Sequence, residues 1–445
     1  MEERFVDMKL AKLLPISATI FDGMLHLAGR SVKKLAERYD TPLYVFDWAT
    51  IVSACTSYKR AFTTQYHASQ VHILYASKAY LSPLIAQLIA QQAMGLDVVS
   101  AGELLVAQRA RFPMDHVFFH GNNKSEDELR LALRLGVGRI VLDNWNELER
   151  LLRIVQGLSY TPAVLLRVAP DVETDTHRYL QTGHAASKFG FPLAEAKHAI
   201  LHILREGSLR LVGLHAHSGT MLREARPYQQ TLKRLLVLAH EVYQETQWWP
   251  EEISPGGGWA IETPDHDATP GVELLATALQ TSMEQTLAAL DTALPPPALI
   301  IEPGRSIIAR AGIAVYRVGA RKSTAGGITY LFVDGGMGDN IRPALYGAHY
   351  SAVAVERVSA PAEETVCIAG RYCESGDVLI ENVRLPQMLD GELLALPTCG
   401  AYCLPMASNY NLVPRPTVLL LDEQQIFLME RRETYNDLMA RYQFR

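Results

Sequence analysis

The sequence predicts an α/β plus all-β protein: a (β/α)8 barrel, or TIM barrel, followed by an antiparallel β domain. Three observations support this fold class. Eight short apolar runs alternate with amphipathic helical stretches between residues 71 and 305, which is typical of parallel strands joined by crossover helices. Eight is the number of strands that closes such a barrel. After Arg305 the helical periodicity nearly vanishes and short alternating strands follow.

The barrel strands can be placed on the eight apolar runs. They are expected at 71–78, 93–100, 116–121, 139–144, 163–170, 210–219, 251–258 and 298–305. The intervening helices carry hydroxyl and glutamate start signals and glycine stop signals, at Ser82 with Pro83, Ser100 with Glu103, Ser125 with Glu128, Gly136 and Gly157. Each predicted strand therefore ends where a loop begins.

The all-β part is predicted to be an antiparallel barrel or sandwich. Its strands are expected at 312–320, 328–334, 351–358, 365–370, 377–384, 392–397, 417–421 and 425–429. Residues 18–29 contain an Asp22-Gly23 turn and resemble a further hairpin of this domain. We therefore expect an N-terminal segment at 1–42 that contributes strands to the β domain, the barrel at 43–306 and the C-terminal β domain at 307–445.

The composition excludes several functional classes. Forty-two basic and 48 acidic residues give a net charge of -6, so no basic surface for nucleic acid or anionic membrane is expected. No uncharged apolar run approaches the roughly 18 residues of a membrane span, and the first ten residues are too charged for a signal peptide. The sequence thus predicts a cytoplasmic protein with a small-molecule partner.

The five cysteines are odd in number and lack the C-x2-C spacing of zinc sites. We expect free thiols and no metal site.

Reactive residues stand at the predicted carboxyl ends of the barrel strands, where barrel enzymes have their active sites. In chain order they are Lys78, Asp97, His120, Arg167, His215, His217, Ser218, Gly256, Gly257, Gly258, Glu302, Gly304 and Arg305. Each of them alone has an ordinary explanation as a solvated or core residue. Together they supply an amine for a Schiff base, a carboxylate for a ring nitrogen and glycine loops for a phosphate, which a pyridoxal phosphate enzyme requires.

The chain resembles the fold-type III pyridoxal phosphate decarboxylases from about Thr41 to its C-terminus. The matching motifs are YASKA at 75–79, LDVVSAGEL at 96–104, GHAASKFG at 183–190, HAHSGT at 215–220, GGG at 256–258, EPGR at 302–305, DGGMGDNIRPALYGA at 334–348, CESGD at 373–377 and GAYCLPMASNYN at 400–411. The resemblance implies an alanine racemase-like barrel and pyridoxal 5'-phosphate as the cofactor.

The resemblance also implies roles for individual residues. Lys78 corresponds to the Schiff-base lysine, Glu302 to the carboxylate beside the pyridine nitrogen, and His217 to the imidazole stacked on the ring. The other implied cofactor-binding residues are Asp97, Arg167, Thr220, Gly257, Gly258, Pro303, Gly304, Arg305 and Tyr402.

The implied reaction is decarboxylation of meso-2,6-diaminopimelate to L-lysine and CO2, the last step of lysine biosynthesis. The implied substrate contacts are Arg305, Arg342, Tyr346, Glu374 and Tyr402, because guanidinium groups suit a distal carboxylate and a carboxylate suits an ammonium group. Cys373 corresponds to a proton-donating cysteine that in this family reaches the neighbouring subunit's cofactor. A homodimer with composite active sites is therefore implied.

Other functions stay open at this point. The substrate could be ornithine, lysine, arginine, carboxynorspermidine or a carrier-bound glutamyl group, although a diamine precursor would leave the arginines without a distal carboxylate. A racemase of this fold typically has an arginine at the ring nitrogen and a catalytic tyrosine, so Glu302 and the CESGD segment argue against it. A non-catalytic cofactor carrier would show no turnover with any amino acid.

Overall fold

The computed structural model describes residues 2–3, 8–66, 71–172, 187–266, 269–290 and 293–443. The chain forms two compact units. The β unit comprises Met1–Ala54, Ile261–Ala268 and Ile307–Arg445, and the barrel unit comprises Cys55–Ala260 and Thr269–Ser306. Each unit is described by itself.

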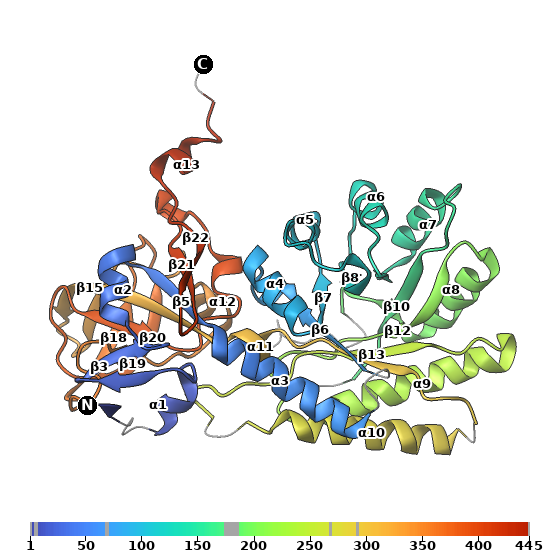
Figure 1. Ribbon diagram of the computed structural model, residues 1–445, viewed down its shortest axis with the longest axis horizontal. Coiled ribbons are helices and arrows are strands. Elements are labelled where there is room, and N and C mark those ends of the chain that lie inside the picture. The colour runs from blue at the N-terminus through green and yellow to red at the C-terminus, as the bar shows by residue number, and fades with distance from the viewer. Residues whose placement is uncertain are drawn as a thin grey trace. The chain divides into compact units, whose positions relative to one another are not determined.

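The barrel unit contains a closed ring of eight parallel strands (Figure 1), which confirms the predicted fold. They are β6 (Val71–Ala76), β7 (Gly95–Val98), β8 (Val117–Phe119), β9 (Arg139–Leu142), β10 (Ala163–Ala169), β12 (Arg210–His215), β13 (Glu252–Gly256) and β14 (Ala298–Ile301). Pairing of β9 with β10 and of β14 with β6 closes the ring. A two-residue strand, β11 (Phe191–Pro192), pairs with β10.

Helices surround this ring of strands (Figure 1). They are α4 (Pro83–Gln91), α5 (Ala101–Arg109), α6 (Glu126–Leu135), α7 (Trp145–Ile154), α8 (Leu193–Glu206), α9 (Arg226–Thr246) and α10 (Val272–Ala289). Short 3-10 turns cover Ser77–Ala79 and Met114–His116. α3 (Trp48–Gln65) and α11 (Arg305–Ile308) cross the boundaries between the two units.

Most of the predicted helix signals act as expected. The Ser82 hydroxyl accepts from the backbone of Ile85, and a complete capping box begins α6. At α5 the box is altered, because the Glu103 carboxylate accepts from the Val99 backbone N–H, one residue before the cap. The stop predicted at Gly157 is wrong: α7 ends at Ile154, and Gly157 lies in the turn that follows.

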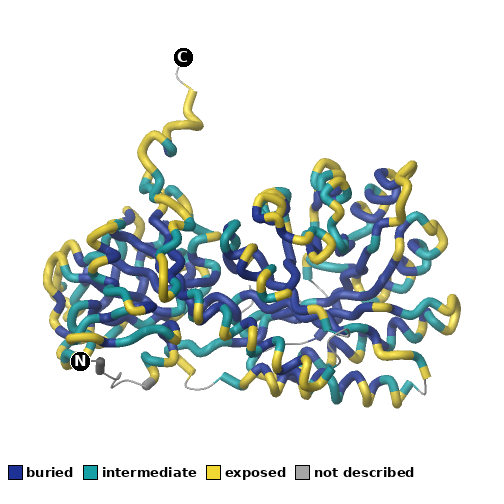
Figure 2. Tube along the Cα trace, viewed as in Figure 1, coloured by how far each residue is buried: buried dark blue, intermediate teal, exposed yellow. Residues whose placement is uncertain are grey.

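Apolar side chains fill part of the interior of the barrel. Six strands contribute one residue each to a cluster, namely Leu74, Phe118, Val141, Leu165, Val212 and Ile300. Figure 2 shows the strands as mostly buried, whereas the surrounding helices alternate between buried and exposed residues. The barrel is therefore a packed core rather than a pore.

The β unit contains a nine-stranded, mostly antiparallel sheet. Its strands are β5 (Leu43–Asp47), β15 (Gly312–Ser323), β16 (Thr329–Val333), β17 (Val353–Ala354), β18 (Glu364–Ala369), β19 (Val378–Leu385), β20 (Leu393–Leu396), β21 (Thr417–Leu421) and β22 (Ile426–Glu430). Two pairs, β16 with β18 and β5 with β21, are parallel. The strand expected at 351–358 shortens to β17.

A second sheet in the β unit is formed by the N-terminal residues. Its strands are β1 (Glu2–Glu3), β2 (Thr19–Phe21), β3 (Met24–Leu27) and β4 (Arg30–Ser31). Asp22 and Gly23 both have positive φ angles, 48° and 73°, as a two-residue hairpin turn requires. Leu25 and Leu27 join the apolar core of the unit together with residues of β5, β15 and β21.

The remaining helices of the β unit are α1 (Met8–Leu13), α2 (Val32–Tyr39), α12 (Arg342–Tyr346) and α13 (Tyr435–Met439), with 3-10 turns at Leu404–Met406 and Tyr410–Leu412. All five cysteines are free, as predicted, and among them Cys373 is exposed. Within the described part of the chain, no helix is both long and apolar enough to cross a membrane.

Candidate active site

A layer of polar residues lies directly above the apolar cluster of the barrel. Successive residues of a strand point to opposite sides, so the residue two positions beyond an inward apolar side chain also points inward. His120, Asp143, Arg167 and Glu302 each follow a cluster residue, respectively Phe118, Val141, Leu165 and Ile300, by two positions. All four are buried. The strand periodicity thus gathers ionisable groups at the carboxyl end of the barrel.

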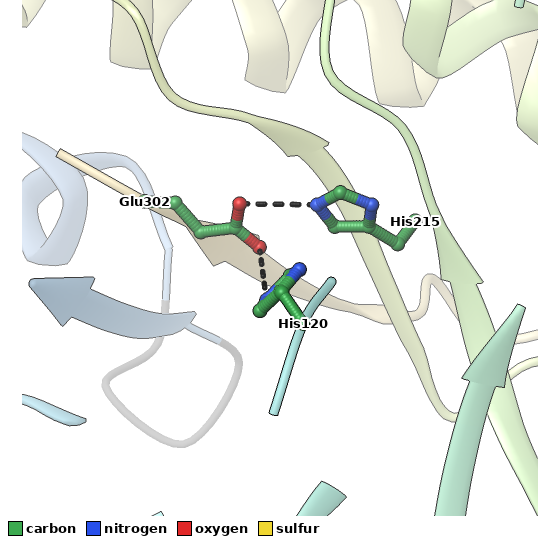
Figure 3. A group of neighbouring side chains, drawn as sticks. All are labelled: His120, His215 and Glu302. Carbon is green, nitrogen blue, oxygen red and sulfur yellow. Dashed lines mark hydrogen bonds and ion pairs between the residues drawn. The ribbon is translucent and has the colours of Figure 1, made fainter. Parts of the chain in front are cut away.

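Glu302 is the centre of this layer. One oxygen of its carboxylate, Oε2, lies 3.0 Å from Nε2 of His215, and the other, Oε1, accepts from the Ser254 hydroxyl at 2.9 Å. Nε2 of His120 lies 3.9 Å from Oε1 (Figure 3). Burial raises the pKa of Glu302, but the neighbouring imidazoles of His215 and His120 lower it more, so its net pKa is below the usual range. Glu302 is therefore ionised.

Asp97 is a second buried carboxyl group in the layer, at 3% exposure. Its Oδ1 lies 3.7 Å from Nε2 of His120. Burial raises the pKa of Asp97 to about 7, although the charge of nearby Lys78 opposes the rise. Lys78 lies in the 3-10 turn that immediately follows β6, and its side chain is exposed.

The glycine run after β13 lies against the end of β14. A Cβ atom on Gly257 would be 1.9 Å from the Glu302 carbonyl oxygen, and one on Gly258 would be 2.0 Å from the Gly219 carbonyl and 3.1 Å from the Cα of Thr220. The Gly257 N–H donates to Nδ1 of His217 at 3.2 Å. Burial lowers the pKa of His217 well below its usual value, so this imidazole is neutral and accepts through Nδ1.

The segment after β14 closes on the first strand of the barrel. The Pro303 carbonyl accepts from the Ala76 N–H at 3.0 Å, and a Cβ on Gly304 would lie 2.9 Å from that of Ala76. Arg305 begins α11 directly afterwards. The predicted loop at 302–305 therefore contacts Ala76, which precedes Lys78 by two positions.

A set of buried ion pairs supports the layer from one side. Arg167 lies 3.7 Å from Asp143 and stacks over the Phe189 ring at 4.5 Å. Lys124 forms a 2.8 Å ion pair with Glu147 and donates to the carbonyls of Gly121 and Val141. The order of residues in the sequence gives no sign that Lys124 and Glu147 pair, because Lys124 lies in the loop after β8 and Glu147 lies in α7.

Three predicted residues meet in the β unit. The Arg342 guanidinium lies 5.1 Å from the Tyr346 ring centre and 5.5 Å from that of Tyr402. Cys373 and Glu374 lie in an exposed turn, where the Cys373 N–H donates to Oδ1 of Asn411 and its carbonyl accepts from the Tyr410 hydroxyl. Of the motif GHAASKFG at 183–190, the first four residues lie outside the described residues.

His120 and His215 stand at predicted strand ends but have no role implied by the sequence, and Ser254 and Lys124 are not among the residues that the sequence singles out. His215 stands opposite Arg167 on one neighbouring strand and opposite Ser254 on the other. Its position two residues before His217 was the only local signal.

Comparison with known proteins identifies this layer as part of a pyridoxal-binding barrel. Residues 48–309 match the family described as pyridoxal-dependent decarboxylase, pyridoxal binding domain. The class of protein is thus a pyridoxal-dependent decarboxylase, with pyridoxal phosphate as its cofactor.

Relatives over the full length narrow the assignment. The chain is 40% identical to the diaminopimelate decarboxylase of Bacillus subtilis over 423 residues, 94% of both chains, and 36% identical to that of Synechocystis, covering 96% of this chain and 92% of the relative. The crystal structure of diaminopimelate decarboxylase from M. jannaschii with L-lysine matches 96% of this chain and 98% of its own at 31% identity, with a TM-score of 0.89. The chain belongs to the diaminopimelate decarboxylase family.

The described residues fit the cofactor. An ionised carboxylate buried among imidazoles suits a protonated ring nitrogen. Gly257 and Gly258, at which any side chain would strike backbone atoms, suit a loop that a phosphate approaches closely.

Proposed function

We propose that this protein is a carboxy-lyase that converts meso-2,6-diaminopimelate to L-lysine and CO2. The single observation that carries the proposal is the full-length similarity to diaminopimelate decarboxylases. The position of the Glu302 carboxylate supports a decarboxylase over a racemase, in which an arginine is expected at that place. The cofactor, when bound, supplies an electron sink for the electron pair that the departing carboxylate leaves behind.

The barrel residues would hold the cofactor and the reacting end of the substrate. Lys78 would bind the cofactor's aldehyde carbon, Glu302 would accept the ring N–H, and neutral His217 would lie against the ring face. The proposed further contacts of ring and phosphate are Asp97, Arg167, Thr220, Gly257, Gly258, Pro303, Gly304, Arg305 and Tyr402. The neutral state of His217 supports this role, because a flat uncharged imidazole can stack on a ring without carrying a second charge into the site.

Residues of the β unit, together with Arg305 of the barrel unit, would supply the groups for the rest of the substrate. Arg342 and Arg305 would bind the distal carboxylate, and Glu374 would bind the distal ammonium group. Tyr346 and Tyr402 would also contact the substrate. Stacking of Arg342 on two tyrosine rings supports its role, because it pre-orients the planar guanidinium for a carboxylate. Cys373 would protonate the α-carbon, for which its exposed position leaves it accessible.

The reaction is tested by CO2 release with chiral analysis of the product. The substrates are meso-diaminopimelate, its LL isomer, lysine, ornithine and arginine. L-Lysine formed from the meso isomer alone is the expected result. CO2 from lysine, ornithine or arginine instead would keep the chemistry but refute the distal-site assignment, and epimerisation without CO2 would make the protein a racemase.

We also propose a homodimer in which Cys373 acts at the partner subunit's cofactor. Mixing the inactive variants Lys78→Ala and Cys373→Ala tests this, because a hybrid dimer would contain one site with both groups intact. Recovery of part of the activity on mixing is expected, and none would be recovered if both residues acted within one subunit. A cytoplasmic location stays a prediction that cell fractionation would test.

A further inference from the structure

Both oxygens of the Glu302 carboxylate have their own donor. His215 at the end of β12 and Ser254 in β13 stand opposite each other across the two neighbouring strands. Their polar atoms reach different oxygens of Glu302, at 3.0 Å and 2.9 Å. Two donors from two strands fix both the direction and the plane of the carboxylate. Asp97 has no such pair of donors among the described residues.

The hydrogen bonding of His215 indicates which nitrogen carries the proton. Its Nε2 faces Glu302, whereas its Nδ1 is buried and has no hydrogen-bond partner among the described residues. A proton on Nδ1 would be a buried donor without an acceptor, which is costly. The arrangement therefore favours the neutral ring with its hydrogen on Nε2, donating to Glu302.

His120 completes the surroundings of the carboxylate without bonding to it. Its ring packs edge-on against that of His215, with centres 4.8 Å apart, and burial lowers its pKa well below the usual value. The charged or titratable groups that interact with Glu302 are His120, His215, His217, Asp97 and Arg167. Lys78 interacts with Asp97, His120 and His217. Among two buried carboxyl groups, the one with two donors keeps the negative charge, which agrees with the opposite pKa shifts of Glu302 and Asp97.

We propose that His215 is a positioning residue: its Nε2–H, together with the Ser254 hydroxyl, holds Glu302 as the anionic partner of the cofactor's ring nitrogen. This rests on the proposed function only in that it requires pyridoxal phosphate to bind beside Glu302. It explains why a second histidine stands two residues before His217. It also assigns a function to a strand pair that has no contact of its own with the substrate in the proposal above.

The test compares variants that remove or keep the donor. His215→Leu removes it, His215→Gln keeps an N–H near the position of Nε2, and Ser254→Ala removes the second donor. Ser282→Ala is the matched control, because it deletes a buried serine hydroxyl in α10, bonded to the Gln229 carbonyl, outside the polar layer. The readouts are the Kd of the apoprotein for pyridoxal phosphate, the pH titration of the bound cofactor's absorbance, and kcat and KM for diaminopimelate.

We expect His215→Leu to raise the Kd for the cofactor about 10- to 100-fold, the effect of losing a hydrogen bond to a charged group. The acid limb of the absorbance titration should move about one pH unit or more upward, because Glu302 then takes up a proton more readily. Ser254→Ala should shift both in the same direction by less. His215→Gln should stay within about threefold of the wild-type Kd. In His215→Leu, kcat should fall by a larger factor than KM changes.

Several results would overturn the proposal. One is a His215→Leu protein whose cofactor titration matches Ser282→Ala; another is equal damage from His215→Gln and His215→Leu, which would mean that shape rather than donation matters. If His215→Leu does not fold, an unshifted cofactor titration in Ser254→Ala is by itself enough to refute the proposal. The possible metal-ligand atoms of His120, His215 and Glu302 lie within 4.8 Å of one another. Stoichiometric zinc in the wild type that is lost in both His215→Leu and His215→Gln would therefore make the cluster a metal centre instead. Failure to decarboxylate diaminopimelate with normal cofactor titrations would refute only the proposed function.

Discussion

At the scale of single residues, the barrel shows how surroundings separate two chemically similar groups. Asp97 and Glu302 are both almost completely buried and both face His120. Burial raises the pKa of Asp97 to about 7, whereas the neighbouring imidazoles of His215 and His120 outweigh the effect of burial at Glu302 and lower its pKa. Both groups are similarly buried, so the difference comes from their neighbours: the imidazoles of His215 and His120 lower the pKa of Glu302, whereas the charge of Lys78 does not offset burial at Asp97.

Substitution of Lys78 tests the most specific catalytic assignment. Lys78→Ala should abolish the visible absorbance of the lysine-linked cofactor and reduce kcat by two to four or more orders of magnitude, because the amine that binds the aldehyde is lost. Absorbance spectra and CO2 release measure the two effects. Lys59→Ala, in α3 and bonded to Gln92, is the control and should retain both properties. Unchanged absorbance in Lys78→Ala would contradict the assignment.

We expect Asp339 to make the stability of the β unit dependent on pH. Its carboxylate is buried, accepts from the hydroxyls of Tyr44 and Tyr316 and from the Gly336 N–H, and has a pKa that burial raises to about 6. A raised folded pKa means that the folded state binds the proton more tightly. Stability should therefore decline as pH rises from about 4 to about 6, by on the order of 3 kcal/mol.

The variant Asp339→Asn cannot titrate and should lack that decline. Denaturant unfolding at pH 4, 5, 6 and 7 (about one-unit steps across the interval) would measure the difference between wild type and variant. The exposed Asp390→Asn substitution is the control and should follow the wild type. The same pH slope in Asp339→Asn as in the wild type would show that another group is responsible.

At the scale of elements, the strand ends are held by buried charges as well as by the ladder hydrogen bonds. Lys124 follows β8, is 2% exposed and donates to a carbonyl of β9, while Glu147 comes from α7. Burial lowers the pKa of Lys124 and raises that of Glu147, and their attraction opposes both shifts. The pair joins the ends of two strands and a helix at one side of the polar layer.

Removing one member of this pair should be costly. Lys124→Met leaves the Glu147 charge buried and unpaired, which we expect to lower the free energy of unfolding by about 3–5 kcal/mol. The double variant Lys124→Met with Glu147→Leu should recover much of the loss, because neither charge remains buried. Urea unfolding followed by fluorescence measures both. A single variant as stable as the wild type would mean that water reaches the site and solvates Glu147.

At the scale of the whole molecule, the chain interleaves its two units. The β unit draws on three separate stretches of sequence, and the barrel unit on two. β5, near the N-terminus, pairs with β15 and β21, which lie more than 250 residues later. Neither unit can therefore be completed by synthesis of a single continuous segment.

Truncation tests this interleaving. A chain of residues 1–306 would leave β5 without either neighbour and expose four apolar residues, Leu43, Tyr44, Val45 and Phe46, that are fully buried in the intact chain. Unpaired apolar strands associate, so this fragment should aggregate in size-exclusion chromatography. Removal of residues 435–445, most of which are exposed, is the control and should leave elution unchanged. A monodisperse 1–306 fragment that binds the cofactor would contradict the expectation.

The sequence by itself determined the eight barrel strands, their order and the polar residues at their ends. These features are local: apolar runs, caps such as Ser125 with Glu128, and the two-residue period that places His120 and Glu302 above apolar neighbours. Local patterns also located the hairpin at Asp22-Gly23. Resemblance to a known family added the roles of Lys78 and His217.

Only the tertiary structure decided which of these residues touch. His215 and Glu302 are 87 positions apart, and their contact depends on the register of the closed ring, which shifts at irregularities between Val164 and Leu165 and between Ile253 and Gly256. The same is true of β5: its uniformly buried run gives no sign of its partners, and pairing with β15 and β21 places it in the β unit rather than the barrel. Register and partner choice are properties of the assembled sheet, because each strand alone satisfies its local pattern equally well in several arrangements.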